Sequence, residues 1–140
     1  MIVATAITFM VAGYDTTGTT LAFACYQLAK NSDIQDMLRQ EIEEVLGENT
    51  KKNISYNDLQ GMTYLDQIIS ETLRFHNPVG LLQRVTSKDY KLPGTDLVLP
   101  KDTMVWFNIY AIHMDPKNYS EPHIFNPDNF SKEAKANRHP

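Results

Sequence analysis

The sequence has little of what several classes of protein depend on. Cys25 is the only cysteine among 140 residues, which excludes an internal disulfide framework and any structural zinc site built from several cysteines. Lys and Arg number 13 against 17 Asp and Glu, giving a net charge of -4 at pH 7, and the basic residues are scattered along the chain. Without a basic patch, we expect no nucleic acid partner.

Charge is especially scarce at the start of the chain, where Asp15 is the only charged residue before Lys30. A run of this length can cross a bilayer, but a central Asp opposes insertion by about 2.5 to 3.5 kcal/mol and offsets most of what the apolar residues contribute. A signal peptide fits no better, because no Lys or Arg precedes the run and no small-residue cleavage site follows it. The pattern therefore favours a helix inside a soluble domain, buried nearly all round.

Hydrophobic periodicity predicts a mainly α-helical chain with short antiparallel β-strands in its second half. Three pairs of a capping residue and an acidic or amide residue mark helix starts, namely Ser32 with Gln35, Ser55 with Asp58, and Thr63 with Asp66. The expected elements are a helix over 1–30, an amphipathic helix over 33–46, a helical turn over 55–61, a helix over 63–76, short strands within 79–113 and a proline-rich meander over 114–140.

The first notable motif is residues 12–17, which read Ala-Gly-Tyr-Asp-Thr-Thr and place a carboxylate and two hydroxyls in an apolar helix. In a structural interpretation, Asp15 faces solvent at a bend and the threonine hydroxyls bond to carbonyls one turn back. In a functional interpretation, Gly13 permits local opening of the helix, while Asp15 and Thr16 order water toward a buried cofactor for proton delivery. The motif alone leaves both interpretations open.

Two further motifs are equally weak on their own. Glu71 and Arg74 stand three residues apart on one helix face, and an exposed pair at this spacing contributes only about 0.2 to 0.5 kcal/mol. Residues 125–130 read Phe-Asn-Pro-Asp-Asn-Phe, and aromatic and proline residues of this kind also anchor ordinary loops. Their order along the chain is more specific than any one of them.

That order resembles the cytochrome P450 family. A helix with Asp-Thr-Thr, a Glu-x-x-Arg helix ending in Asn-Pro, short strands and a Phe-x-Pro-x-x-Phe meander follow one another as they do in that family. Residues 99–103 and 112–117 also look like the family's strand and loop segments. The resemblance covers essentially the whole chain and implies that residues 1–140 are a fragment of the cytochrome P450 fold, one partial domain.

On this resemblance, the helix over 1–30 is similar to the long central helix that crosses the oxygen-binding face of the haem. Ala12 and Gly13 would then lie over the porphyrin. Thr16 resembles the hydroxyl that hydrogen-bonds the activated oxygen, and Asp15 resembles the acid that relays protons to it. We therefore expect Asp15 and Thr16 to be catalytic.

The resemblance assigns roles to residues after the first helices as well. Glu71 and Arg74 resemble the buried pair that fixes the core beneath the haem, and Arg84 takes the place of a contact to a haem propionate. An apolar substrate pocket, suited to lipophilic molecules, is also implied. Its expected lining residues are Val11, Val79, Gly80 and Leu81.

The implied activity is that of a haem-thiolate monooxygenase, which inserts one atom of O2 into a lipophilic small molecule. Its electrons would come from NADPH through NADPH-cytochrome P450 reductase. The pattern is closest to animal microsomal members, of the insect detoxifying kind. The implied location is the cytoplasmic face of the endoplasmic reticulum membrane, reached through an N-terminal anchor that we expect to precede Met1.

The sequence departs from the family pattern at two points. The meander commonly carries an Arg that completes a trio with the Glu-x-x-Arg pair, whereas Asn129 stands there and cannot supply that charge. The chain also ends at Pro140, before the loop whose cysteine would ligate iron, so we expect no metal ligand among these residues. We expect both ends to be truncations and the isolated chain to be inactive.

Two other classes of protein remain as alternatives. An all-helical interaction module would present the apolar face of residues 33–46 to a partner helix, but it gives Asp15 no role and leaves the strand and meander motifs unexplained. A single-span membrane protein would place the first helix in a bilayer, and solubility of residues 1–60 without detergent would count against it.

The resemblance predicts how the natural sequence continues. Within about a dozen residues of Pro140, by the register of the meander motif, it should reach Phe-x-x-Gly-x-Arg-x-Cys-x-Gly. Sequencing a longer transcript checks this directly. A stop codon immediately after Pro140, or a continuation without that cysteine, would contradict the monooxygenase assignment.

Overall fold

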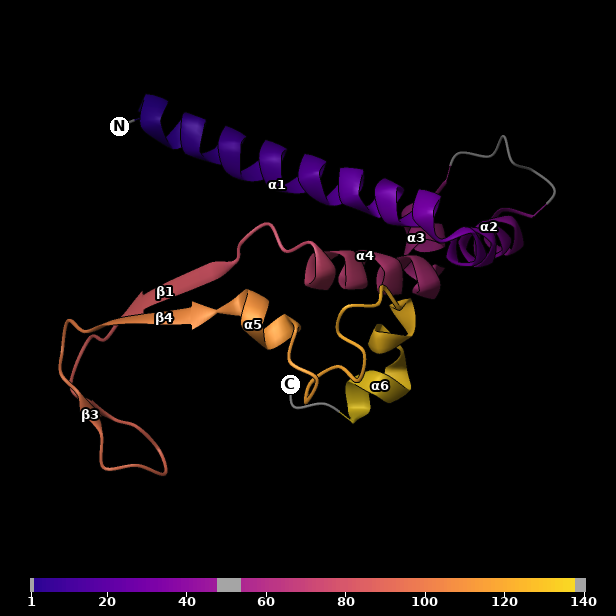
Figure 1. The fold of residues 1–140 in the computed structure, drawn as a ribbon. Helices are drawn as coiled ribbons and strands as arrows, with labels where there is room; N and C mark the ends of the chain where they lie inside the picture. Colours follow the sequence, from indigo (N-terminus) through magenta and orange to yellow (C-terminus); the bar gives the residue numbers. More distant parts are fainter. Residues whose placement is uncertain (1, 48–53, 138–140) are drawn as a thin grey trace.

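The computed structural model describes residues 2–47 and 54–137, in which helices come first and short strands and turns follow. The helix α1 (Ile2–Lys30) runs along one side of the molecule, and α4 (Thr63–Phe75) lies beside its C-terminal half (Figure 1). At that end the chain folds back through α2 (Ser32–Leu46) and α3 (Tyr56–Gly61). The mainly α-helical fold class with short antiparallel strands is therefore confirmed.

Two small antiparallel sheets follow α4. In the first, β1 (Leu81–Val85) pairs with β4 (Met104–Asn108), with Leu81 opposite Asn108 and Val85 opposite Met104. In the second, β2 (Tyr90–Lys91) pairs with β3 (Val98–Leu99), and Gly94 in the connecting turn has a φ of 73°. A positive φ suits glycine because it has no Cβ, so Gly94 lets this short hairpin close.

The strand region ends earlier than the predicted range of 79–113, because residues Ile109–His113 form a helix, α5. The Asn108 side chain accepts a hydrogen bond from the backbone N–H of Ala111 at 3.0 Å and so caps the helix directly after β4. Two short helices also lie in the proline-rich meander, namely η1 (Pro127–Phe130) and α6 (Lys132–Ala136). In the described part of the meander these two helices have only four and five residues.

The predicted capping box at Ser32 and Gln35 is wrong. Asn31 is the N-cap of α2, and its side chain bonds back to the Gln27 carbonyl and amide oxygens instead of capping α2. By contrast, the box formed by Ser55 and Asp58 is present at the start of α3.

The start of α4 is capped from another helix rather than by Thr63, which is its first helical residue. The Glu41 carboxylate on α2 accepts hydrogen bonds from the backbone N–H groups of Tyr64 and Leu65, at 2.7 and 2.9 Å. A carboxylate at a helix N-terminus satisfies unpaired N–H groups and also suits the helix dipole. This contact joins α2 to α4.

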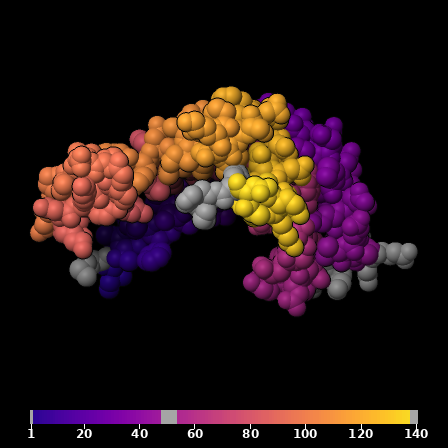
Figure 2. Space-filling view, turned by 90° about the horizontal axis from the view of Figure 1, so that it is seen from below, coloured from indigo at the N-terminus to yellow at the C-terminus, as the bar shows by residue number. Residues whose placement is uncertain are grey.

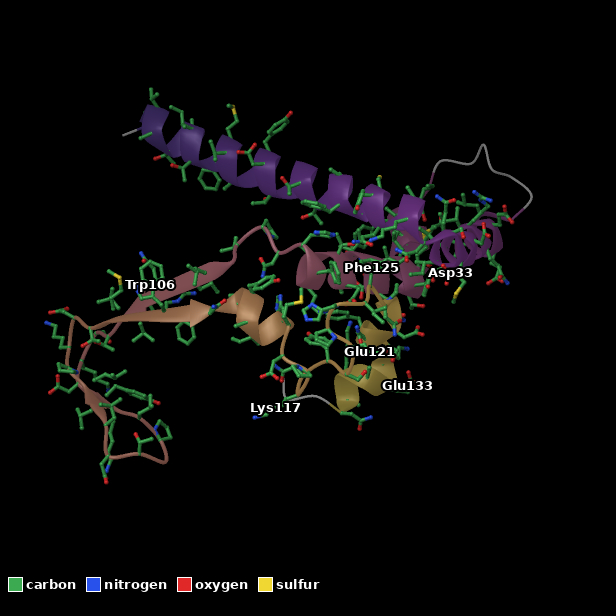
Figure 3. The ribbon with its side chains drawn as sticks, viewed as in Figure 1. Asp33, Trp106, Lys117, Glu121, Phe125 and Glu133 are labelled. Atoms are coloured by element: carbon green, nitrogen blue, oxygen red, sulfur yellow. The ribbon has the colours of Figure 1, made fainter. Side chains whose placement is uncertain are left out.

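The core lies at the end of the molecule where α2, α4 and the meander meet. Ile34 and Leu38 from α2, Ile68 from α4 and Phe125 from the meander form one buried cluster. Figure 3 shows Phe125 at α4, and Trp106, which belongs to β4, lies well away from it. The two sheets therefore add little to this core.

The expectation that the first helix is buried nearly all round is wrong for this chain. Ala24 and Gln27 are its only buried residues, and Phe9 near its start is 76% exposed. The physical reason is that α2 and α4 pack only against the C-terminal part of α1. Seen from below, the molecule is an arch with the strands at one end and α2 and α3 at the other (Figure 2). Within residues 2–47 and 54–137, no helix combines the length and hydropathy needed to cross a membrane.

The core makes a simple stability prediction. Ile68→Ala should lower the free energy of unfolding by about 2 to 5 kcal/mol, because Ile68 is fully buried and its truncation leaves a cavity. Leu97→Ala is the control, since Leu97 is 55% exposed and the change should stay within about 0.5 kcal/mol. Urea unfolding of both variants, made in the full-length protein, measures the difference in their free energies of unfolding. Equal shifts would show that the cluster around Ile68 is not the core.

Candidate functional site

The most elaborate polar arrangement in the described chain surrounds Glu71 and Arg74 on α4. Both side chains are buried, with 0% and 1% of their surface exposed. Arg74 Nε donates to Glu71 Oε2 at 2.7 Å and Arg74 Nη2 donates to Glu71 Oε1 at 2.7 Å. Two parallel charge-assisted hydrogen bonds of this kind fix both planes relative to each other. The alternative of an ordinary exposed pair therefore does not apply.

The remaining N–H groups of Arg74 fasten α4 to distant segments. Nη1 donates to the carbonyls of His113 and Pro122, each at 2.9 Å, and Nη2 donates to the carbonyl of Ile124 at 3.3 Å. A guanidinium has five N–H donors in a fixed fork, so every one of them has an acceptor. Arg74 thus holds the end of α5 and the meander against α4.

Glu71 accepts two further hydrogen bonds from the meander. The backbone N–H of Asn126 donates to Oε1 at 2.9 Å, and the Asn129 side-chain amide donates to the same oxygen at 3.2 Å. Asn129, which stands where the family commonly has Arg, therefore contributes a hydrogen bond and no charge. The cluster holds one buried negative and one buried positive charge, which balance each other.

Aromatic rings and a histidine complete this cluster. Arg74 Cζ lies 4.7 Å from the centroid of the Tyr119 ring and 5.4 Å from that of Phe75, within the range of cation–π attraction. His113 Nδ1 lies 3.2 Å from the Arg74 carbonyl and 3.4 Å from the side-chain Nδ2 of Asn77. Burial lowers the pKa of His113, and the hydrogen bond to the Arg74 carbonyl opposes this shift only in part.

The segment with Asp15 and Thr16 lies on the exposed part of α1. Thr16 Oγ1 donates to the Ala12 carbonyl at 2.6 Å, and Thr20 Oγ1 donates to the Thr16 carbonyl at 2.8 Å. The helix is continuous through Gly13. For the threonines this geometry matches the structural interpretation, and Gly13 does not open the helix. The Asp15 side chain is exposed and makes no hydrogen bond with any residue between 2 and 47 or 54 and 137.

A small apolar cavity connects this segment to α4. Its volume is about 310 Å³. Its walls are Thr16, Thr17, Thr20 and Leu21 on one side and Ile69, Leu73 and Pro78 on the other. Thr16 and the Glu-x-x-Arg helix therefore face a shared space, although Thr16 does not contact Glu71 or Arg74.

The other predicted site residues lie apart from the buried cluster. The Val79 N–H donates to the Asn77 side chain at 2.8 Å, and the Gly80 carbonyl accepts from Ile109 at 3.1 Å. Leu81 is 54% exposed on β1. Two more of these residues are also exposed, Val11 on α1 and Arg84 on β1, where Arg84 Nη1 donates to its neighbouring carbonyl.

The residues expected to meet a haem fit some of its contacts and not others. Ala12 and Gly13 offer a small-residue surface on an uncovered helix, and a Cβ added at Gly13 would meet nothing within 4 Å. The exposed guanidinium of Arg84 suits a carboxylate such as a propionate. Cys25, the only thiol, lies exposed on α1, the same helix as Ala12 and Gly13. Among the described residues, Ala12, Gly13 and Arg84 are therefore compatible with contacts to a porphyrin and its propionate.

Sequence reasoning missed several members of the buried cluster. His113, Pro122 and Ile124 act through backbone carbonyls, which any residue carries, so their identity gives no signal. Tyr119 lies within the aromatic and proline-rich meander and was not singled out, although an aromatic ring near a buried Arg is a common arrangement.

Comparisons with known proteins find sequence matches along the whole chain. The family model described as Cytochrome P450 matches residues 1–140. Cytochrome P450 6B6 of Helicoverpa armigera is 46% identical over 140 residues, covering 100% of this chain and 28% of the relative. Probable cytochrome P450 6a14 of Drosophila melanogaster is 44% identical over 137 residues, covering 98% and 27%. Cytochrome P450 6k1 of Blattella germanica is 43% identical over 130 residues, covering 93% and 25%. The chain thus spans about a quarter of the length of these curated relatives.

The buried cluster predicts unequal costs for two Arg truncations. Arg74→Ala should lower the free energy of unfolding by about 3 to 5 kcal/mol, because the Glu71 charge would stay buried without its partner. Arg39→Ala is the matched control, since Arg39 pairs with Asp36 at the same i, i+3 spacing but on the surface, where loss of the pair costs about 1 kcal/mol or less. Chemical denaturation compares them. Similar denaturation midpoints for the two variants would show that the buried Glu71–Arg74 pair stabilises the fold no more than the exposed pair does.

Proposed function

Because the chain belongs to the cytochrome P450 family, we propose that its residues serve a haem-thiolate monooxygenase that inserts one atom of O2 into a lipophilic small molecule. The observation that carries this proposal is the buried Glu71–Arg74 pair. It supports the proposal because two N–H donors of Arg74 bind Glu71, and the other three hold α4 against the end of α5 and the meander. A site that holds a large planar cofactor requires rigid supporting elements, and these hydrogen bonds fix α4 in place.

Three residues of this chain would hold the haem. Ala12 and Gly13 would lie against the porphyrin, since neither has a side chain larger than a methyl group. Arg84 would bind a propionate, because its exposed guanidinium can form two parallel hydrogen bonds with a carboxylate. When bound, the haem supplies the redox chemistry that activates O2.

Asp15 and Thr16 would deliver protons from the side of the haem that α1 covers. The Asp15 carboxylate is open to solvent, so it can exchange protons with bulk water and pass them on. Thr16 Oγ1 uses its own proton to bond the Ala12 carbonyl at 2.6 Å, which leaves the lone pairs of the oxygen free to accept from an ordered water. In this scheme Thr16 holds the water and Asp15 supplies the proton.

The substrate would meet an apolar wall. Val11 from α1 and Val79, Gly80 and Leu81 after α4 are small or apolar, and none of them is buried by this chain. They present no charge that would orient a polar molecule. This supports a lipophilic substrate, held by burial of its apolar surface more than by hydrogen bonds.

The electron donor and location follow from the same family membership. We infer that electrons come from NADPH through NADPH-cytochrome P450 reductase, and that the protein works at the cytoplasmic face of the endoplasmic reticulum membrane. The similarity to insect cytochromes P450 of the 6B, 6a and 6k groups supports a microsomal enzyme of the insect kind.

The proton-handling role makes a prediction for the full-length protein. Thr16→Ala should leave substrate affinity nearly unchanged, because the hydroxyl acts after O2 has bound, while product per NADPH falls severalfold and hydrogen peroxide rises. Thr8→Ala is the control, since Thr8 makes the same hydroxyl-to-carbonyl bond, to Ala4 at 2.9 Å, two turns earlier. Product, peroxide and NADPH are measured together. If both variants stay as well coupled as the unmodified protein, Thr16 only shapes the helix.

A further inference from the structure

The ring of His76 packs between α1 and the end of α4. His76 is the C-cap of α4, and its ring lies parallel to that of Phe23 on α1, with centroids 4.0 Å apart and planes 6° apart. Tyr26 and Phe75 present their edges to the same ring, at 6.3 and 5.1 Å. Stacked and edge-on aromatic pairs of this geometry are attractive and directional. The imidazole is therefore held in one orientation by three rings.

A hydrogen bond fixes the same ring to α1. Gln27 Nε2 lies 2.7 Å from His76 Nε2, and Gln27 Oε1 accepts from the Asn31 side-chain amide at 3.2 Å. Since the amide oxygen is taken by Asn31, the Gln27 NH2 group faces the imidazole and donates to it. His76 Nε2 must then be without a proton, and the ring is neutral. Burial, and secondarily the Lys30 charge, lower the pKa of His76 and favour the same state.

This contact lies where α1 is anchored. Ala24 and Gln27 are the only buried residues of α1, and both are within about one turn of Phe23. Toward the N-terminus, the cavity of about 310 Å³ separates Thr16 on α1 from Leu73 and Pro78. Thr16 precedes Phe23 by seven residues, which is about 10 Å along the axis at 1.5 Å per residue. Because α1 is one continuous helix, a shift where it is anchored would also move Thr16.

We propose that His76 is a positioning residue: its neutral ring, stacked on Phe23 and bonded to Gln27, sets where Asp15 and Thr16 lie relative to the Glu71–Arg74 helix. This inference rests on the proposed monooxygenase function, because it assigns His76 a part in placing the proton-handling pair. His76 itself does not contact substrate or haem in this scheme. It acts through the placement of α1.

The test uses two variants of the full-length holoprotein. His76→Phe keeps an aromatic ring against Phe23 and removes the hydrogen-bond acceptor, while Gln27→Met keeps the side-chain length and removes the donor. Both should retain haem and substrate KM but lower product per NADPH by about tenfold, since a misplacement of roughly 1 Å in a catalytic group can cost as much as 100-fold. The double variant should be no worse than either single one, because both remove the same bond.

The controls separate this role from general damage. His123→Phe changes an exposed histidine and should leave product per NADPH unchanged. If His76→Phe loses haem, Gln27→Met decides the question, since its aromatic stack is intact. Full coupling in a haem-loaded Gln27→Met variant overturns the positioning role. Absence of any product from the unmodified protein with reductase, NADPH and lipophilic substrates overturns the proposed function itself, and this inference with it.

Discussion

The rest of this structure depends on one buried pair of charges. Glu71 and Arg74 have almost no exposed surface, and a charge buried without compensation would be strongly destabilising. Compensation requires acceptors for Arg74 and donors for Glu71 at fixed places, and residues 113, 122, 124, 126 and 129 supply them. The meander has little regular secondary structure, so these contacts, with the packing of Phe125, determine its path. The conformation of the meander therefore depends largely on the two buried charges of α4.

Asn129 shows how such a cluster tolerates a change of residue type. The Glu71 carboxylate is already neutralised by Arg74, so a third group needs only to supply a donor. The Asn129 amide does so at 3.2 Å. The resulting cluster carries no net charge, whereas a second Arg would leave an excess positive charge to be balanced elsewhere. A hydrogen bond can thus stand in the position of an ion pair when the charge balance is already complete.

Sequence patterns predicted the local features of this fold better than the long-range ones. The capping box at Ser55 was predicted because its two residues lie three apart, although the equally local box predicted at Ser32 and Gln35 does not form. The cap of α4 was not predicted, because Glu41 reaches it from a separate helix. The exposure of α1 was misjudged for a related reason, since an apolar sequence shows that a surface suits burial but not which segment covers it. The carbonyl acceptors of Arg74 carry no sequence signal at all.

The uneven anchoring of α1 divides one helix into two thermodynamic parts. Near Ala24 and Gln27, the helix is tied to α4 by rings and a hydrogen bond, so opening its amides requires breaking tertiary contacts. Toward Phe9, which is 76% exposed, little tertiary packing covers the helix, and local opening is correspondingly easier. Amide hydrogens within these residues would exchange with solvent along a gradient, slowest at the anchored end. A single unbroken helix can in this way be held firmly near Gln27 and still open more readily toward Phe9.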